Sequence, residues 1–315
     1  MSLRRYCCFG LAAVSIGCGR ADIATDGPLV VFTAGSLARP MRAALDSFAA
    51  SNGVRYELES AGSLETARKV TELEKVPDLI ALADEDVFPK VLLPRHATWY
   101  VRFAANRIVL AYTDRSRYAA EIDSTNWWQV LQRPDLEIGR SNPDLDPSGY
   151  RTLMVWQLAE RLYAQPGLAA ALERAAHLRN VRPKEIELVA LLESGDLDYA
   201  WFYESMARAS GVRHVTLPAA IDLGAADNRD AYAQAAVRVI GSSAADTVIM
   251  RGAPIRYAFS IPLNAEHPAL AERFAAFLLS ADGRRVLERE FLSTLDAPDA
   301  VGTGVPVMVQ SALSR

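Results

Sequence analysis

The sequence predicts an α/β protein built from two lobes. Its 315 residues suffice for two units of about 100–200 residues, each with its own core. Short apolar runs alternate with helical patterns, which indicates sheets with crossover connections. Strands at 108–112 and 255–261 are candidates for two crossings between the lobes. We therefore expect lobe 1 to comprise residues 28–112 and 253–315 and lobe 2 to comprise residues 113–252, with hinge closure around a ligand.

The first part of lobe 1 shows two strand–turn–helix units followed by a buried strand. The apolar run Leu29–Phe32 ends at the turn Ala34-Gly35-Ser36, after which apolar residues recur at helical spacing. The second unit repeats this order around Ala61-Gly62-Ser63. The elements expected here are strands at 29–32, 56–59 and 78–83 and helices at 37–48 and 64–74.

The pattern restarts after a continuous apolar strand, and it returns to lobe 1 near the end of the chain. The later strands are rich in aromatic and β-branched residues, which favour extended structure. The elements expected here are strands at 108–112, 198–203 and 255–261 and helices at 127–131, 149–163, 187–193, 270–278 and 281–290.

Composition excludes several functions. Lys and Arg number 34 against 38 Asp and Glu, and a net charge of −4 argues against nucleic-acid binding. All three cysteines lie within the first eighteen residues, so the body has no structural disulfide, Cys-based zinc site or cysteine nucleophile. Phosphate-binding-loop, dinucleotide-binding, zinc-protease and serine-hydrolase motifs are missing. These absences favour a binding protein without a cofactor and not an enzyme.

The N-terminus has the features of an export signal. Arg4 and Arg5 precede an apolar run at residues 6–17, which has signal-peptide length and is too short for a permanent membrane span. The following Ser15-Ile16-Gly17-Cys18 resembles a lipobox, in which Cys18 is lipidated; simple cleavage nearby is the alternative. We expect a signal peptide at 1–17, a tether at 18–27, and a protein in the periplasm or on the outer face of the cell membrane, anchored through Cys18.

Small residues recur where strands pass into helices. Gly35-Ser36 and Gly62-Ser63 each lie at an expected helix N-terminus, and Asp146-Pro147-Ser148-Gly149 offers a third such turn. Unpaired N–H groups and the helix dipole can hold an anion there without Lys or Arg. Serine is also an ordinary N-cap residue, so one such turn carries little information. Three of them favour an oxyanion cleft.

Two further positions come from the second lobe. Arg182-Pro183-Lys184-Glu185 opens a helix, with Glu185 near its positive end. Tyr203 ends the strand at 198–203. Taken alone, Glu185 is a favourable first-turn acid and Tyr203 an ordinary strand aromatic.

Long segments of the chain resemble the tungstate/molybdate-binding proteins of ABC importers, in particular their tungstate-binding branch. The resemblance extends from about Val30 to Leu292. It implies a class II periplasmic-binding-protein fold, with an oxyanion between two α/β lobes and an ABC permease as partner of a monomer. The segments that carry it are AGSLARP at 34–40, AGSLETARKVTELEKVPDLIALAD at 61–84, WYVRFAANRIVLAYTDRSRY at 99–118, NWWQVLQRPDLEIGRSNPDLDPSGYRTLMVWQLAERLY at 126–163, RPKEIELVALLESGDLDYAWFY at 182–203 and PIRYAFSIPLNAEHP at 254–268.

The resemblance also implies a set of ligand residues. Amide and hydroxyl groups come from lobe 1, while Asp146 and Glu185 approach the tungsten or molybdenum centre directly and join four oxo groups. Two departures stand out: Ser148 replaces a frequent Cys, and the stretch 172–182 is shorter than in archaeal members. The implied oxyanion-binding residues are Gly35, Ser36, Ser63, Asp146, Ser148, Glu185 and Tyr203.

The two acids decide between ligands. A carboxylate beside a dianion repels it by about 1 kcal/mol per pair in water, and by more in a dry cleft. Hard oxygen donors suit a high-valent metal, whereas sulfate and phosphate have no comparable expandable centre. Tungstate or molybdate is therefore the expected ligand. Another tetrahedral oxyanion, such as sulfate or phosphate, is the nearest alternative, and an exported hydrolase that uses Asp146 and Glu185 is the more distant one.

Overall fold

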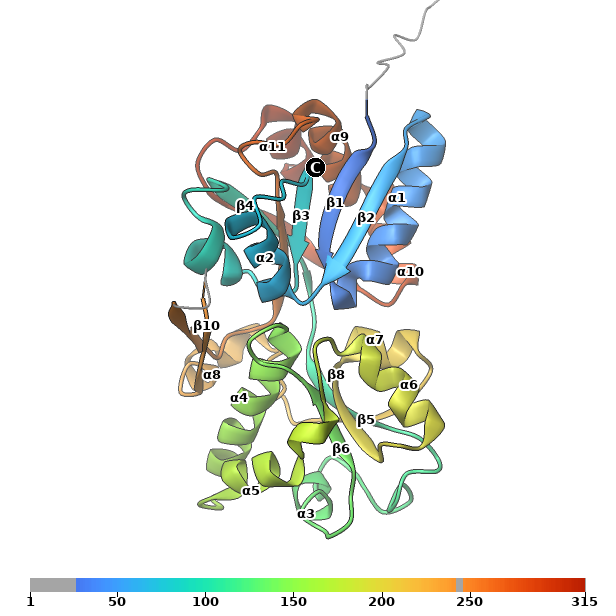
Figure 1. Ribbon diagram of the computed structural model, residues 1–315, viewed down its shortest axis with the longest axis vertical. Helices are drawn as coiled ribbons and strands as arrows, with labels where there is room; N and C mark the ends of the chain where they lie inside the picture. Colours follow the sequence, from blue (N-terminus) through green and yellow to red (C-terminus); the bar gives the residue numbers. More distant parts are fainter. Residues whose placement is uncertain (1–26, 242–245, 315) are drawn as a thin grey trace, which may run out of the picture.

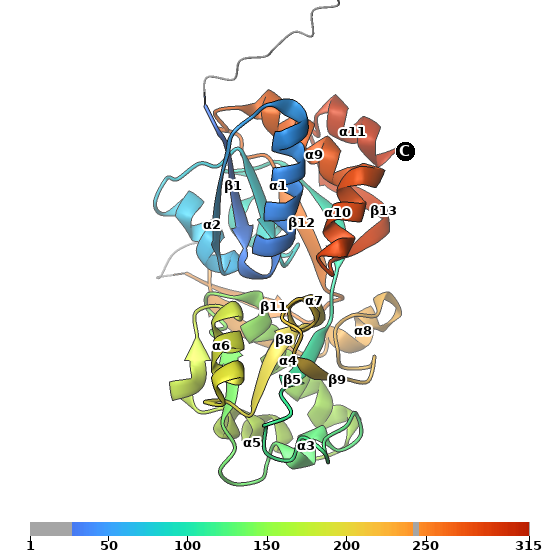
Figure 2. The ribbon, with the colours of Figure 1, turned by 90° about the vertical axis from the view of Figure 1, so that its right-hand side faces the viewer.

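The computed structural model describes residues 27–241 and 246–314, which form two α/β lobes. Figure 1 shows one lobe above the other, and Figure 2 shows the same stacking from the side. The expected signal peptide, Cys18 and nearly all of the tether lie outside the described residues. Within the described part of the chain, no helix has the length and apolar character needed to cross a membrane.

Lobe 1 is built on a six-stranded mixed sheet with the order β13-β4-β12-β3-β1-β2. Strand β1 pairs in parallel with β2 and β3, whereas β12 and β13 pair antiparallel to β4. The carboxyl ends of β1, β2 and β3 therefore meet at the same edge, which faces lobe 2 (Figure 1). The strands are β1 (Leu29–Ala34), β2 (Tyr56–Ala61), β3 (Leu79–Leu82), β4 (Trp99–Ala105), β12 (Arg256–Ser260) and β13 (Ser293–Gly302).

Helix α1 (Ala38–Asn52) follows from the apolar spacing of its sequence. Met41, Leu45 and Phe48 recur on one face and are buried. Phe48 packs against Phe274, with ring centroids 5.2 Å apart, so residues distant in sequence share one core. The other helical elements of this lobe are η1 (Gly35–Leu37), α2 (Ser63–Thr71), η2 (Phe88–Leu92), α9 (Pro268–Leu279), α10 (Ala281–Arg289) and α11 (Val307–Leu313).

Lobe 2 has a five-stranded mixed sheet with the order β7-β6-β8-β5-β9. Its core centres on Trp201, whose ring lies 5.4 Å from Trp127 and 5.9 Å from Trp156 in edge-on contacts. The elements are β5 (Ile108–Tyr112), α3 (Trp127–Val130), β6 (Ile138–Ser141), α4 (Pro147–Leu162), α5 (Leu168–Ala175), η3 (Leu178–Asn180), β7 (Val181–Arg182), α6 (Ile186–Ser194), β8 (Tyr199–Tyr203), α7 (Glu204–Ala209) and β9 (Arg213–Thr216).

The chain passes between the lobes in a way that differs in one detail from the expectation. Strand β5 (Ile108–Tyr112), which we had grouped with lobe 1, pairs with β8 and β9 in the second sheet. The first crossing therefore lies at Asn106–Arg107, directly after β4. The return passes beside it, because Ile108 N–H donates to Asp222 O and Ile255 N–H donates to Leu223 O. We accordingly propose a lobe boundary near residue 106 in place of 112.

A small subdomain precedes the return crossing. It holds a two-stranded antiparallel ribbon, which contacts both lobes. Arg68 of lobe 1 donates to Ile240 O, and Gln157 of α4 exchanges hydrogen bonds with the backbone of Ala236. Its elements are η4 (Ala226–Asn228), α8 (Arg229–Tyr232), β10 (Ala236–Ile240) and β11 (Thr247–Arg251).

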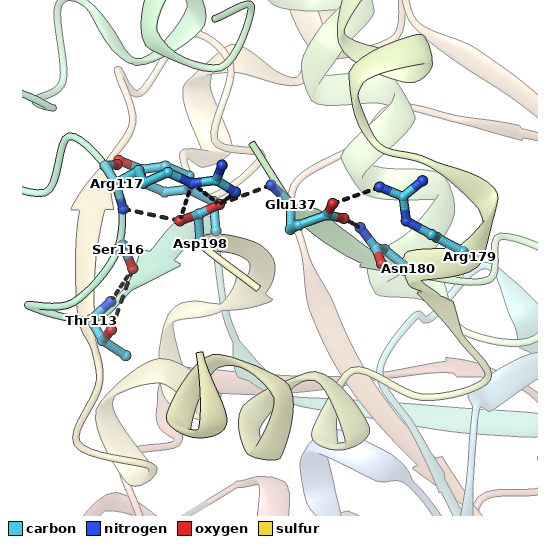
Figure 3. Close-up of polar contacts among 8 residues, drawn as sticks. Thr113, Ser116, Arg117, Glu137, Arg179, Asn180 and Asp198 are labelled. Carbon is cyan, nitrogen blue, oxygen red and sulfur yellow. Dashed lines mark hydrogen bonds and ion pairs between the residues drawn. The ribbon is translucent and has the colours of Figure 1, made fainter. Parts of the chain in front are cut away.

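A polar network, drawn in Figure 3, links several elements of lobe 2 near its surface. The carboxylate of Asp198 accepts hydrogen bonds from the Arg117 side chain, at 2.6 Å for the shortest, and from Glu137 N–H. The carboxylate of Glu137 in turn accepts from Arg179 and Asn180. All these partners belong to lobe 2, so the network holds that lobe together independently of lobe 1.

Candidate functional site

Lobe 1 presents its predicted site residues at the ends of β1 and β2. Gly35 and Ser36 lie in η1, immediately after β1, and Ser63 is the first residue of α2. Neither hydroxyl caps its helix: Ser36 Oγ accepts from Tyr257 Oη at 3.0 Å, and Ser63 Oγ accepts from Ala83 N–H at 3.0 Å. Glu65 N–H donates across the lobes to Leu145 O at 3.4 Å, which leaves the N–H groups of Ser63 and Leu64, the first two of α2, without an acceptor inside the helix and able to serve an anion.

Lobe 2 contributes two carboxyl groups from two helix N-termini. Asp146 is the N-cap of α4, and its Oδ1 accepts from Ser148 N–H at 3.1 Å. Its Oδ2 accepts from Glu185 N–H, also at 3.1 Å. Glu185 is the N-cap of α6, and its Oε2 accepts from Tyr203 N–H at 3.1 Å. Of the four residues predicted in this lobe, three donate a backbone N–H to a carboxyl group of the cluster: Ser148, Glu185 and Tyr203. The Ser148 N–H donates to Asp146.

Two polar atoms in this cluster make no hydrogen bond of normal geometry. Glu185 is fully buried, and its Oε1 and Ser148 Oγ lack such a bond among the described residues, although the Ser148 hydroxyl is close enough to the Glu185 carboxyl to lower its pKa. Buried polar atoms in folded proteins are normally satisfied. An unsatisfied carboxyl oxygen and a nearby hydroxyl therefore indicate a place where a polar solute supplies the missing contacts.

The two lobes touch directly at this site. A Cβ atom added to Gly62 would lie 2.0 Å from Leu145 O and 3.1 Å from the Cα of Asp146. Glycine is required there because the N-terminus of α2 and the loop before α4 approach each other backbone to backbone. Gly35 has more room, since its Cβ would lie 4.0 Å from the Cβ of Lys184. The structure is therefore a closed form, in which the segments that carry the predicted residues of the two lobes are in contact.

A continuous path of contacts joins these residues. Ser36 bonds to the Tyr257 hydroxyl, and the Tyr257 ring meets the Tyr203 ring edge-on at 5.7 Å. Tyr203 N–H reaches Glu185, whose own N–H reaches Asp146. Asn106, at the first crossing, donates to the same Tyr257 hydroxyl at 2.9 Å, so the path also includes the hinge.

Burial controls the charge of the two acids. Burial raises the pKa of Asp146 to about 6, although hydrogen bonds from Ser148 and Glu185 N–H and the charge of Arg151 act in the opposite direction. Burial, followed by the neighbouring Asp146 charge, raises the pKa of Glu185 well above its usual range. Without a solute, the closed site therefore shifts the protonation equilibrium of both carboxyl groups toward the neutral form. A ligand that bonds to both carboxylates would displace those protons.

Sequence reasoning missed one group at this site. Arg151, one turn into α4, is buried against Asp84 of lobe 1 with an N···O distance of 2.8 Å. Tyr150 donates to the same carboxylate. The signal in the sequence is weak, because an arginine in a helix is ordinarily exposed to solvent. Their partner lies more than sixty residues away, beyond any local pattern.

Comparison with known proteins identifies the family. The family model described as bacterial extracellular solute-binding protein matches residues 29–292. The chain belongs to this family. As a solute-binding protein it is not an enzyme, so the hydrolase alternative for Asp146 and Glu185 is set aside.

Relatives of this solute-binding protein cover most of its length. It is 40% identical over 276 residues to an uncharacterized solute-binding protein of Petrotoga mobilis, covering 87% of this chain and 86% of the relative. It is 34% identical over 301 residues to the molybdate/tungstate-binding protein WtpA of Thermococcus kodakarensis, covering 87% and 84%.

Solved structures show the same two-lobe fold at low sequence identity. The sulfate-binding protein SubI of Mycobacterium tuberculosis has a TM-score of 0.60 at 15% identity, covering 90% of this chain and 89% of that one. The periplasmic molybdate-binding protein of Azotobacter vinelandii has a TM-score of 0.58 at 16% identity, covering 84% and 98%. The expected two-lobe α/β periplasmic-binding-protein fold is thereby confirmed.

Proposed function

We propose that this solute-binding protein captures molybdate or tungstate in the cleft and delivers it to an ABC permease. The observation that carries the proposal is the pair of buried carboxyl groups of Asp146 and Glu185, held by backbone amides within one cleft. The resemblance to molybdate/tungstate-binding proteins at 33–34% identity supports the same class of solute.

The donor set suits an oxyanion with a metal centre. Each oxygen of Asp146 accepts one amide hydrogen bond, and Glu185 Oε1 accepts none, so both groups keep lone pairs for a metal. Hard carboxylate oxygens bind high-valent tungsten or molybdenum, whose coordination expands from four oxo groups to six ligands. The amides and hydroxyls at Gly35, Ser36 and Ser63 would then hold the oxo groups from lobe 1.

The same arrangement disfavours sulfate and phosphate. Their central atoms take no further ligands, so two ionised carboxylates would only repel the dianion. The site could hold them only with both carboxyl groups protonated. Discrimination against these abundant anions would thus come from Asp146 and Glu185.

We further propose that residues 1–17 direct export and that Cys18 anchors the protein by a lipid. The tether at 18–27 would then link the anchor to β1. In Figure 1 the start of β1 lies at the end of lobe 1 that is distant from lobe 2, so a membrane anchor there leaves the cleft accessible.

Titration calorimetry with tungstate, molybdate, sulfate and phosphate tests the proposed solute. We expect tight binding of tungstate or molybdate, and sulfate weaker by at least about 100-fold, which is about 2.7 kcal/mol. Glu185→Gln should weaken tungstate strongly, whereas Glu187→Gln, an exposed acid in the first turn of the same helix, should leave it unchanged. Equal affinity for sulfate and tungstate would contradict the carboxylate-to-metal proposal.

A further inference from the structure

An ion pair joins the two lobes beside the proposed site. Asp84 follows β3 in lobe 1, and Arg151 lies in α4 of lobe 2, with 2.8 Å between Arg151 Nη2 and Asp84 Oδ2. The two side chains are 4% and 7% exposed. It is the only ion pair among the described residues in which both side chains are less than a tenth exposed.

Most hydrogen-bond partners of the Asp84 side chain come from the opposite lobe. Its Oδ2 accepts from both Arg151 and Tyr150, and both residues belong to the opposite lobe. Among the described residues of lobe 1, only Asp86 N–H donates to the Asp84 carboxylate, and it reaches Oδ1 at 3.0 Å. Opening of the lobes separates these partners and returns both charges to water.

The pair is connected to proposed ligand residues on both sides of the cleft. Arg151 Nη1 donates to Ala83 O at 3.3 Å, and Ala83 N–H donates to Ser63 Oγ at 3.0 Å. The same Nη1 also donates to the Tyr203 hydroxyl oxygen, at 3.4 Å. One guanidinium therefore contacts the Ala83 backbone, which holds Ser63 in lobe 1, and the Tyr203 hydroxyl in lobe 2.

We propose that Asp84 and Arg151 form a closure latch, a buried ion pair made when the lobes close that positions Ser63 and Tyr203 for the solute. Both are positioning residues, and the proposal rests on the proposed function of the cleft. A buried ion pair adds little net free energy, because burial removes the hydration of both charges. Removal of one partner, in contrast, leaves an uncompensated charge in the closed form and disfavours closure.

The test is a double-mutant cycle on the full chain, using Asp84→Asn, Arg151→Met and the double variant. Tungstate affinity and dissociation rate are measured by calorimetry and stopped flow, and compaction by small-angle X-ray scattering. We expect Asp84→Asn to weaken tungstate about 100-fold, mainly through faster dissociation, and to reduce the compaction that tungstate causes. The double variant should lose less than the sum of the single losses, because it contains no unpaired charge.

Matched controls separate a latch from a general loss of stability. Asp198→Asn breaks the Arg117 pair inside lobe 2 (Figure 3) and should lower the melting temperature without a faster dissociation of tungstate. Tyr150→Phe removes only the hydrogen bond from an uncharged hydroxyl to the Asp84 carboxylate, and it leaves the ion pair itself in place. It should raise the dissociation rate of tungstate by about tenfold. This variant keeps the latch testable even if Asp84→Asn folds poorly.

The outcomes distinguish the latch from the proposed function. Tungstate binding by the wild-type protein, together with wild-type dissociation rates in Asp84→Asn and Tyr150→Phe, would overturn the latch and leave the function standing. Additive losses in the cycle would also overturn it. Failure of the wild-type protein to bind any of the four oxyanions would overturn the proposed function, and with it the latch as a device for that solute.

Discussion

The two buried carboxyl groups should make the empty protein less stable at neutral pH than at acid pH. A carboxyl group whose pKa is raised on folding stabilises the folded state fully below its unfolded pKa. That contribution is lost as the pH rises through the folded value. For Asp146 the pKa rises from 3.8 to about 6. At about 1.4 kcal/mol per pH unit, this is about 3 kcal/mol lost between about pH 4 and pH 7. The raised pKa of Glu185 acts in the same direction.

Glu185→Gln removes one of these acids and keeps its shape. The Gln oxygen can still accept from Tyr203 N–H, and no ionised group then remains at this position. We expect the ligand-free variant to match the wild type near pH 4.5 and to exceed it at pH 7.5. The sign follows from the raised pKa of Glu185, since burial penalises its ionised form in the folded protein and the amide of Gln carries no charge at either pH.

Tungstate should reverse this order. At 100 times Kd the wild-type protein gains about 2.7 kcal/mol from binding, whereas the variant gains much less. Thermal unfolding at pH 4.5 and 7.5, with tungstate added at pH 7.5, measures both effects, and Glu187→Gln is the matched control. A variant that is less stable than the wild type at pH 7.5 without tungstate would refute the reasoning. Glu185 would then be a structural partner of Tyr203 and not a strained ligand.

Two further predictions follow from the same geometry, and a third follows from the N-terminal sequence. Gly62→Ala should weaken tungstate binding by at least about 100-fold, because its Cβ would lie 2.0 Å from Leu145 O in the closed form. Gly35→Ala introduces only ordinary van der Waals contacts and should change the Kd for tungstate by less than about fivefold. Calorimetry measures both values. Tungstate binding at pH 7 should release protons from Asp146 and Glu185, so the apparent binding enthalpy should vary with the ionisation enthalpy of the buffer. Proton uptake would instead indicate neutral carboxyl groups around a tetrahedral anion. Cys18→Ser should move the protein from the membrane fraction to the released fraction, and an unchanged distribution would exclude a lipid anchor on that residue.

Local patterns in the sequence predicted the elements that present the site. Strong apolar periodicity marked β1, α1 and β8, and small residues after strands marked the turns at Gly35 and Gly62. A turn of this kind depends on neighbouring residues alone, so its position can be predicted from a short window. The pairing of Asp146 with Glu185 came from the resemblance to a family, since thirty-nine residues separate them.

Features that depend on distant partners were either not predicted or assigned to the wrong lobe. Strand β13 (Ser293–Gly302) is largely exposed and breaks its register against β4 between Thr294 and Asp299, so it has no alternating apolar pattern. Strand β5 is apolar throughout and fits either sheet; its pairing with β8 and β9 decides the lobe. The Asp84–Arg151 pair likewise exists only because closure brings two lobes together.

The coordination number of bound tungsten tests the central claim most directly. X-ray absorption at the tungsten edge, on the protein loaded with one equivalent of tungstate, counts the oxygen neighbours of the metal. We predict six neighbours in the wild-type protein, with two more distant than the four oxo groups, and fewer in Glu185→Gln. Four equivalent oxygens in the wild-type protein would contradict direct bonding by Asp146 and Glu185.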